Sequence, residues 1–240
     1  MKKILLLLLF IPMLSNAQLK DLVKKATKKV TTVTKTNSTL DIAAGLKEAL
    51  NKGVTEQVSK LTAEDGFYKN EAVKILIPEE LQKVEKTLRK MGMSSLADEG
   101  IKSLNRAAED AVKTSTPIFV DAIKGMSFTD AKNILFGNEN AATVYLQSST
   151  TKPLYAKFSP VVQESISKVG ADVVWANIIK KYNSIPLVSK VNPDITDYVT
   201  NKALDGVFKM ITVEEKNIRT NLSSRTSDVL KKVFALQDKK

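Results

Sequence analysis

Apolar residues recur every three or four positions along most of this chain, and this helical period limits the fold more than any other feature. Ile42, Leu46 and Val54 begin the first such stripe, and similar stripes follow almost to the C-terminus. The short run AVKILI at 72–77 is ambiguous, but no long stretch alternates apolar and polar residues as a half-buried strand would. We therefore predict an all-α single domain over residues 39–240.

The predicted helices are short, because prolines, glycines and capping residues interrupt the period often. Pro153 and Pro160 are expected to divide the region that ends at Gly170 into two helical pieces, since a proline lacks the N–H that a helix interior needs. Two pairs have the spacing of an N-terminal capping box: Ser127 with Asp130, and Thr212 with Glu215. These signals predict an irregular arrangement of about nine or ten short helices.

The first residues, MKKILLLLLFIPMLSNAQ, have the features of a secretory signal peptide. Two lysines precede an apolar run that is too short to span a bilayer, and small residues surround a cleavage site after Ala17. Cleavage there would remove residues 1–17 and leave 240 − 17 = 223 residues. We expect a protein exported to the periplasm or beyond the cell. No later segment has the ~18 apolar residues of a transmembrane helix, so we expect no membrane span in the mature chain.

Residues 18–38 form a distinct segment rich in lysine and threonine, which we call the basic tether. It carries six lysines and one acid. Its apolar residues have helical spacing, so it could lie as an amphipathic helix on an anionic membrane surface. Threonine is a poor helix former and the segment has no Trp or Phe, which favours a flexible tether.

The mature chain has a formal charge of +9, because 37 − 2 basic residues remain against 26 acids after the leader is removed. Such a charge favours encounter with anionic components of the cell envelope, either lipid head groups or polysaccharide. Export argues against nucleic acid as the partner.

The chain has no cysteine and no histidine. Without disulfides, the hydrophobic core alone must hold the fold of an exported protein. Thiol nucleophiles, histidine bases and the usual zinc and copper ligands are excluded as well. We expect no metal and no cofactor, while carboxylate, lysine, tyrosine or serine chemistry stays open.

Two helix segments and the break between helices at 65–70 carry polar residues that could form a site. Arg106 could clamp a carboxylate or phosphate, and Glu109 could act as a base. The simpler interpretation is an ion pair on one solvated helix face. Asp205 borders Gly206, and a glycine inside a helix marks close packing or the approach of a ligand. The candidates for a pocket between helices are Tyr68, Lys69, Asn105, Arg106, Glu109 and Asp205.

Seven stretches of this sequence resemble a bacterial family, domain of unknown function family 4197. They are GLKEALNKGV at 45–54, DGFYKNEAVKI at 65–75, SLNRAAE at 103–109, PIFVDAI at 117–123, LYAKF at 154–158, NPDITDYVTNKALDG at 192–206 and RTSDVLKKVF at 225–234. The resemblance covers about residues 40–235 and implies an all-helical exported protein of Gram-negative bacteria. Many members look like lipoproteins, whereas this chain lacks the cysteine of a lipoprotein leader. The resemblance implies no activity and no site.

Two functions are consistent with these features. The first is a non-enzymatic binding or structural module of the cell envelope that acts through a basic surface and the tether. The alternative is a small-molecule binder or an enzyme whose pocket uses the six polar candidates. The lack of a recognisable catalytic set favours the first. The alternative requires the six side chains to converge on one concave site.

Overall fold

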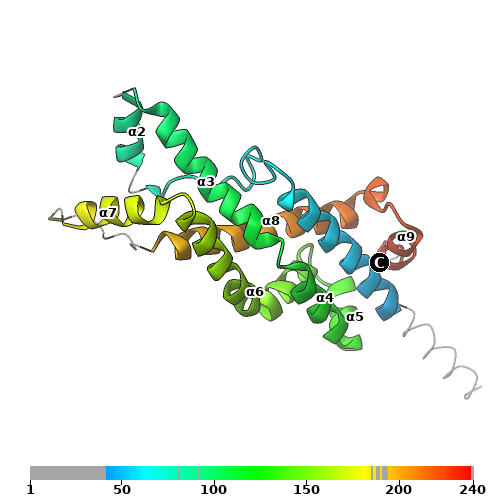
Figure 1. Ribbon diagram of the computed structural model, residues 1–240. Helices are drawn as coiled ribbons and strands as arrows, with labels where there is room; N and C mark the ends of the chain where they lie inside the picture. Colours follow the sequence, from blue (N-terminus) through cyan, green and yellow to red (C-terminus); the bar gives the residue numbers. More distant parts are fainter. Residues whose placement is uncertain are drawn as a thin grey trace, which may run out of the picture. The chain divides into compact units, whose positions relative to one another are not determined.

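A computed structural model describes residues 42–79, 82–90, 92–184, 186–187, 190 and 194–238, and α-helices joined by short connections make up most of them (Figure 1). Residues 43–240 belong to one structural unit, which contains all the helices labelled in Figure 1. The predicted signal peptide at 1–17 and the basic tether at 18–38 lie outside the described residues.

The helices follow one another closely along the chain. The first covers 42–62 in its described part. The later elements are α2 (Gln82–Lys90), α3 (Ser94–Val112), α4 (Thr116–Gly125), α5 (Phe128–Leu135), α6 (Ala141–Ser167), α7 (Ala171–Asn183), α8 (Ile195–Thr220), the short 3-10 helix η2 (Leu222–Ser224) and α9 (Asp228–Phe234). No strand occurs among the described residues, so the predicted all-α class is confirmed. The eight helices α2 to α9 come close to the predicted nine or ten. In the same residues, no helix is long and apolar enough to cross a membrane.

Three helices, α3, α6 and α8, pack against one another at the centre of the fold (Figure 1). Ala107, Ala108 and Ala111 of α3 are completely buried, and their small side chains let the neighbouring helices approach closely. Phe119 of α4 packs edge-to-face against Phe208 of α8, with the ring centroids 6.2 Å apart. The polar candidates of α3 and α8 therefore lie on helices that form the tightly packed core.

α6 is one continuous helix of 27 residues, so the predicted division at Pro153 and Pro160 is wrong. A proline inside a helix leaves the carbonyl four residues earlier without its usual donor. Those carbonyls belong to Ser149 and Ala156, which are exposed, as are both prolines. Water can bond the freed carbonyls there, while the opposite face of α6, including Leu154, stays buried in the core.

One of the two predicted capping boxes is present. Ser127 accepts a hydrogen bond from the N–H of Asp130 at 3.1 Å, and the Asp130 carboxylate accepts one from the N–H of Ser127 at 2.9 Å. The second box is wrong, because Thr212 and Glu215 both lie inside α8. Thr212 donates its hydroxyl to the carbonyl of Phe208 at 2.8 Å, and Glu215 bonds to α6 instead.

Candidate functional site

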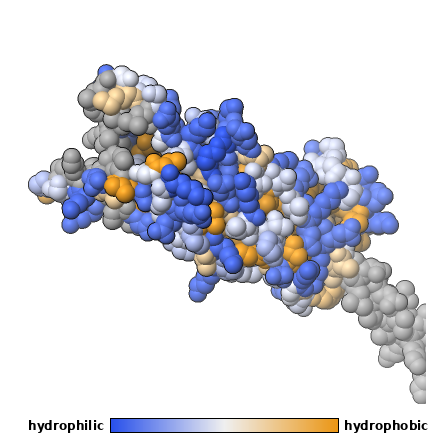
Figure 2. Space-filling view, viewed as in Figure 1, coloured by the Kyte–Doolittle hydropathy of each residue, from blue (hydrophilic) through white to orange (hydrophobic). Residues whose placement is uncertain are grey.

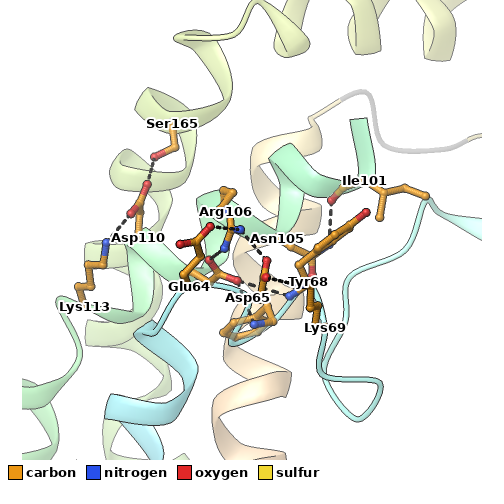
Figure 3. A network of polar contacts seen from close by, with 12 residues as sticks. Glu64, Asp65, Tyr68, Lys69, Ile101, Asn105, Arg106, Asp110, Lys113 and Ser165 are labelled. Carbon is orange, nitrogen blue, oxygen red and sulfur yellow. Dashed lines mark hydrogen bonds and ion pairs between the residues drawn. The ribbon is translucent and has the colours of Figure 1, made fainter. Parts of the chain in front are cut away.

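A tight turn follows the first helix and lies beside α3 (Figure 3). Asp65 has φ +66°, a left-handed conformation that aspartate adopts more readily than most residues. A Cβ at Gly66 would lie 2.5 Å from the carbonyl oxygens of Lys60 and Leu61, so only glycine fits there. The next residue, Phe67, is fully buried. The Asp-Gly pair therefore makes the turn that places Phe67 in the core.

Glu109 of α3 is buried and bonds to the backbone of this turn. Its Oε1 accepts hydrogen bonds from the N–H groups of Phe67 at 3.0 Å and Tyr68 at 3.4 Å. Its Oε2 bonds to the guanidinium of Arg106. Only 5% of the Glu109 side chain is exposed, and a buried carboxylate is tolerated when such partners replace water. The interpretation of a solvated ion pair on one helix is therefore wrong for Glu109.

Arg106 contacts two further carboxylates of the turn (Figure 3). Its Nη2 lies 2.6 Å from Asp65 and 3.3 Å from Glu64. Lys69 adds an ion pair with Asp65 at 2.7 Å. With Glu109, these groups alternate in sign, so the pairs hold Asp65 in its left-handed conformation against α3.

Asn105 of α3 holds residues 74–78, which follow the turn without forming a helix or a strand and which we call the extended segment. Its Oδ1 accepts a hydrogen bond from the N–H of Ile75, and its Nδ2 donates to the carbonyl of Ile75, both at 2.8 Å. Nδ2 also donates to the carbonyl of Ile101 at 2.8 Å. The buried amide thus takes the place of the neighbouring strand that an extended segment usually pairs with. In the ambiguous run at 72–77, residues 72 and 73 therefore belong to a turn, and residues 74–77 form neither a helix nor a strand.

Five of the six sequence candidates lie together at this turn. Tyr68 donates its N–H to Glu109, and the ammonium of Lys74 lies 5.0 Å from the centre of its ring. Lys69, Arg106 and Glu109 bond to the turn or to its carboxylates, and Asn105 bonds to Ile75, so these polar groups serve the fold. We use the name turn clamp for the four side chains that fasten the turn and the extended segment to α3, namely Asp65, Asn105, Arg106 and Glu109.

The sixth candidate, Asp205, lies apart from the turn clamp on α8, with 72% of its side chain exposed. Its neighbour Gly206 is buried against the turn. A Cβ at Gly206 would lie 2.7 Å from Cε1 of Phe67 and 3.3 Å from Cβ of Val73. Close packing therefore accounts for Gly206, as the first of the two sequence interpretations proposed.

Replacing Asp65 by asparagine is expected to make folding less sensitive to acid. The hydrogen bond from Lys69, and after it the one from Arg106, lowers the pKa of Asp65 from its ordinary value of 3.8. Such a group stabilises the fold above its unfolded pKa, and this contribution is lost as pH falls through the lower, folded pKa. Asparagine tolerates the same backbone conformation and does not titrate. As the pH is lowered below the ordinary pKa of 3.8, urea denaturation should show a smaller loss of unfolding free energy in Asp65→Asn than in the wild type; equal losses would contradict this.

Asp205 lines an open groove of about 650 Å³ between the extended segment and α8. Residues 73–79 and Gln82 form one side, and Trp175 of α7 and Lys190 lie at the groove as well. The α8 side consists of residues three and four positions apart, which share one helix face: Asp197, Tyr198, Asn201, Lys202 and Asp205.

Hydrogen bonds fix several groove side chains in place. Tyr198 donates its hydroxyl to the carbonyl of Leu76 at 2.8 Å, which ties α8 to the extended segment. Asp197 accepts from the hydroxyl of Tyr155 at 2.6 Å and from Nδ2 of Asn201 at 3.0 Å. The hydrogen bond to Asp197, followed by burial, raises the pKa of Tyr155, so the phenol stays a neutral donor. Hydrogen bonds therefore hold the side chains of Tyr198, Asp197 and Asn201 in place along the groove.

The groove can bind a ligand through hydrogen bonds, charges and aromatic faces. Its lining carries three ammonium groups and three carboxylates: Lys74, Lys190 and Lys202, and Glu79, Asp197 and Asp205. Over the described ranges, no three such acidic side chains are grouped so that they could hold a metal ion.

A third polar network joins the ends of α5 and α6 to α8, and the sequence prediction missed it. Glu215 accepts hydrogen bonds from the N–H groups of Ala142 and Thr143 at 2.8 Å each, at the start of α6. Arg219 pairs with Glu215 at 2.8 Å and donates to the carbonyl of Ile134, at the end of α5, at 2.7 Å. Only 2% of the Arg219 side chain is exposed. The spacing of Glu215 and Arg219, four residues apart in one helix, is the signal that the sequence offers.

A family profile matches the chain over almost all the residues that form these sites. It is described as protein of unknown function (DUF4197) and covers residues 36–235, which include the turn clamp, the groove and the Glu215–Arg219 pair. No curated protein and no solved structure matches the chain. Because the profile covers well over half of the 240 residues, the chain belongs to the DUF4197 family of proteins of unknown function.

Proposed function

We propose that this protein is an exported, non-enzymatic binding or structural module of the cell envelope, attracted to anionic envelope components by its basic tether. One observation supports a non-enzymatic role: the side chains that could act on a substrate, Glu109 and Arg106, bond to the turn and to each other. Glu109, the candidate base, already accepts two backbone N–H groups and pairs with Arg106. A general base needs a lone pair that faces the substrate, and the guanidinium of Arg106 already pairs with the carboxylates of Asp65 and Glu109.

The charge distribution supports an electrostatic partner. The basic tether at 18–38 contributes 6 − 1 = +5 of the +9 of the mature chain, and the remaining 202 residues contribute +4. Positive charge is therefore concentrated in 21 residues and diluted over the rest. The leader at 1–17 supports export to the periplasm or beyond the cell. In this proposal, lipid head groups or acidic polysaccharide bind mainly to the tether.

The helical domain offers a weaker field to such partners. Figure 2 shows a mainly hydrophilic face with apolar residues scattered across it. Many of the lysines belong to local ion pairs, such as Lys60 with Glu56 at 2.9 Å and Lys168 with Glu164 at 2.8 Å. The fields of paired surface charges largely cancel beyond a screening length of about 8–10 Å.

The test replaces the six tether lysines by glutamine in the mature chain and measures binding to anionic lipid vesicles and to an acidic polysaccharide. At 50 mM salt we expect affinity to fall at least about ten-fold, because each lysine near an anionic surface contributes about 1 kcal/mol. Wild-type binding should weaken strongly at 300 mM salt. The mass of the purified native protein checks that it begins at Gln18. The two binding arms show which anionic component is the partner.

A matched control removes the same charge from the helical domain. It replaces six exposed lysines by glutamine: Lys52, Lys86, Lys102, Lys132, Lys152 and Lys157. We expect affinity to fall by less than about three-fold, because these charges are dispersed. Equal losses in the two variants, absence of binding at low salt, or binding that ignores salt would contradict the proposal.

A further inference from the structure

We propose that the groove between the extended segment and α8 binds an uncharged oligosaccharide. This rests on the proposed envelope function and names a ligand class for a site separate from the tether. The groove volume of about 650 Å³ lies within the ~300–1,000 Å³ range of ligand pockets in proteins. Residues of α2, α7, α8 and the extended segment line it together, and its volume suits a chain of linked rings better than one small ion.

The charges of the groove favour an uncharged ligand. Its three lysines and three carboxylates balance in number, so the lining has no net formal charge. Lys202 pairs loosely with Asp205 at 3.9 Å, and Lys74 pairs with Glu71 at 3.7 Å. A polyanion or polycation would place part of its charge beside like charges here, whereas hydroxyl groups can bond to carboxylates and ammonium groups alike.

The combination of flat aromatic faces and short polar side chains favours a sugar. A pyranose ring has C–H groups on its faces and hydroxyls at its rim. Trp175 and Tyr198 are half-buried against the core, which holds their rings in place, and the ammonium of Lys202 lies 5.9 Å from the centre of the Tyr198 ring. Asn201 and Asp205 lie one turn apart on the same face of α8, and Tyr198 lies one turn before Asn201. A bound sugar can therefore contact the ring of Tyr198 and form hydrogen bonds with Asn201 and Asp205 along one face of α8.

An extended peptide is the other polymer that such a groove could hold, and the backbone of the extended segment is poorly suited to it. Peptide capture beside an extended segment relies on free N–H and C=O groups along one edge. The N–H and C=O of Ile75 bond to Asn105, and the carbonyl of Leu76 accepts from Tyr198. Pro78 has no N–H. The backbone groups of Ile75 and the carbonyl of Leu76 are therefore already used and do not pair with a peptide.

The test uses the single tryptophan of the chain, Trp175, as a reporter inside the groove. The mature protein is titrated with chitotetraose, cellotetraose and maltotetraose, and binding is followed by tryptophan emission and by calorimetry. We expect a saturable emission change with at least one of these sugars. Its dissociation constant should agree within about two-fold between 50 and 500 mM salt, because an uncharged ligand displaces no ions. This insensitivity to salt separates the groove from the tether.

Two variants tie the signal to the groove. Asp205→Asn, a change at an exposed position, is expected to weaken binding at least about ten-fold, since it removes a charge-assisted hydrogen bond to a hydroxyl. Asp228→Asn is the matched control: it also removes an exposed carboxylate that pairs with a lysine three residues away, at 3.8 Å, and should leave affinity unchanged. Replacing the six tether lysines should leave it unchanged too.

The sugar proposal is overturned if none of the three sugars binds, if Asp205→Asn binds as tightly as the wild type, or if an uncharged tetrapeptide gives the saturable signal instead. Failure of the sugar titrations with intact salt-dependent vesicle or polysaccharide binding would remove the groove proposal alone. Loss of the tether effect with intact sugar binding would remove the electrostatic part of the envelope function alone.

Discussion

Arg219→Met is expected to lower the free energy of unfolding by about 3–5 kcal/mol, because it leaves the buried carboxylate of Glu215 without its cation. The guanidinium bonds to Glu215 and to the carbonyls of Ile134 and Leu135, at 2.7–3.2 Å. Methionine fills a similar volume but offers none of these donors. Equilibrium denaturation in urea measures the change. The end of α5 and the start of α6 should also lose protection in hydrogen exchange, since Arg219 bonds to the end of α5 and pairs with Glu215, which bonds to the start of α6.

A second change distinguishes an uncompensated charge from lost packing. Adding Glu215→Gln to Arg219→Met should recover part of the lost stability, because no charge is left unpaired and the amide oxygen can still accept from one of the two N–H groups, that of Ala142 or that of Thr143. Arg89→Met is the surface control: Arg89 also pairs with two carboxylates, but 35% of its side chain is exposed. We expect that change to cost much less stability than Arg219→Met, because water screens the exposed pairs. Equal losses at Arg89 and Arg219 would contradict the role of burial.

The parts of the fold that follow from local chemistry could be predicted from the sequence. The helical period, the capping box of Ser127 with Asp130 and the turn at Asp65 and Gly66 each depend on residues close in the chain. The continuity of α6 through Pro153 and Pro160 could not be predicted, because it depends on which face of the helix meets the core. A proline pattern on a buried face would have broken the helix as expected.

The site was only partly predictable for the same reason. The proximity of Arg106 and Glu109 follows from their spacing in one helix, and the structure confirms that they pair. The partners of the other Glu109 oxygen do not follow from spacing in one helix, because Phe67 and Tyr68 lie 42 and 41 residues away. Likewise, Thr212 and Glu215 have a capping-box spacing, but tertiary packing extends α8 through both and turns Glu215 towards α6. Spacing alone identified the polar residues and left their partners open.

Glu109→Ala is expected to lower the free energy of unfolding by about 3 kcal/mol. The change leaves the buried N–H of Phe67 without an acceptor and Arg106 without its buried partner. Glu109→Gln should cost less, because the amide oxygen can still accept from Phe67, while the charge and the acceptor for Arg106 are lost. Hydrogen exchange at the amides of Phe67 and Tyr68 reports the contact directly, and their protection should fall in the alanine variant and largely persist in the glutamine variant.

Glu64→Ala is the control, because Glu64 is the exposed carboxylate on the same arginine, at 3.3 Å with 85% of its side chain exposed. It should change stability by less than about 0.5 kcal/mol. The comparison also separates the two functions considered for these residues. A carboxylate kept in an active site for catalysis is often unfavourable for folding, so its removal tends to leave stability unchanged or to raise it. A large loss at Glu109 beside none at Glu64 therefore identifies Glu109 as part of a structural clamp, whereas a stable Glu109→Ala protein would restore the enzyme alternative at this turn.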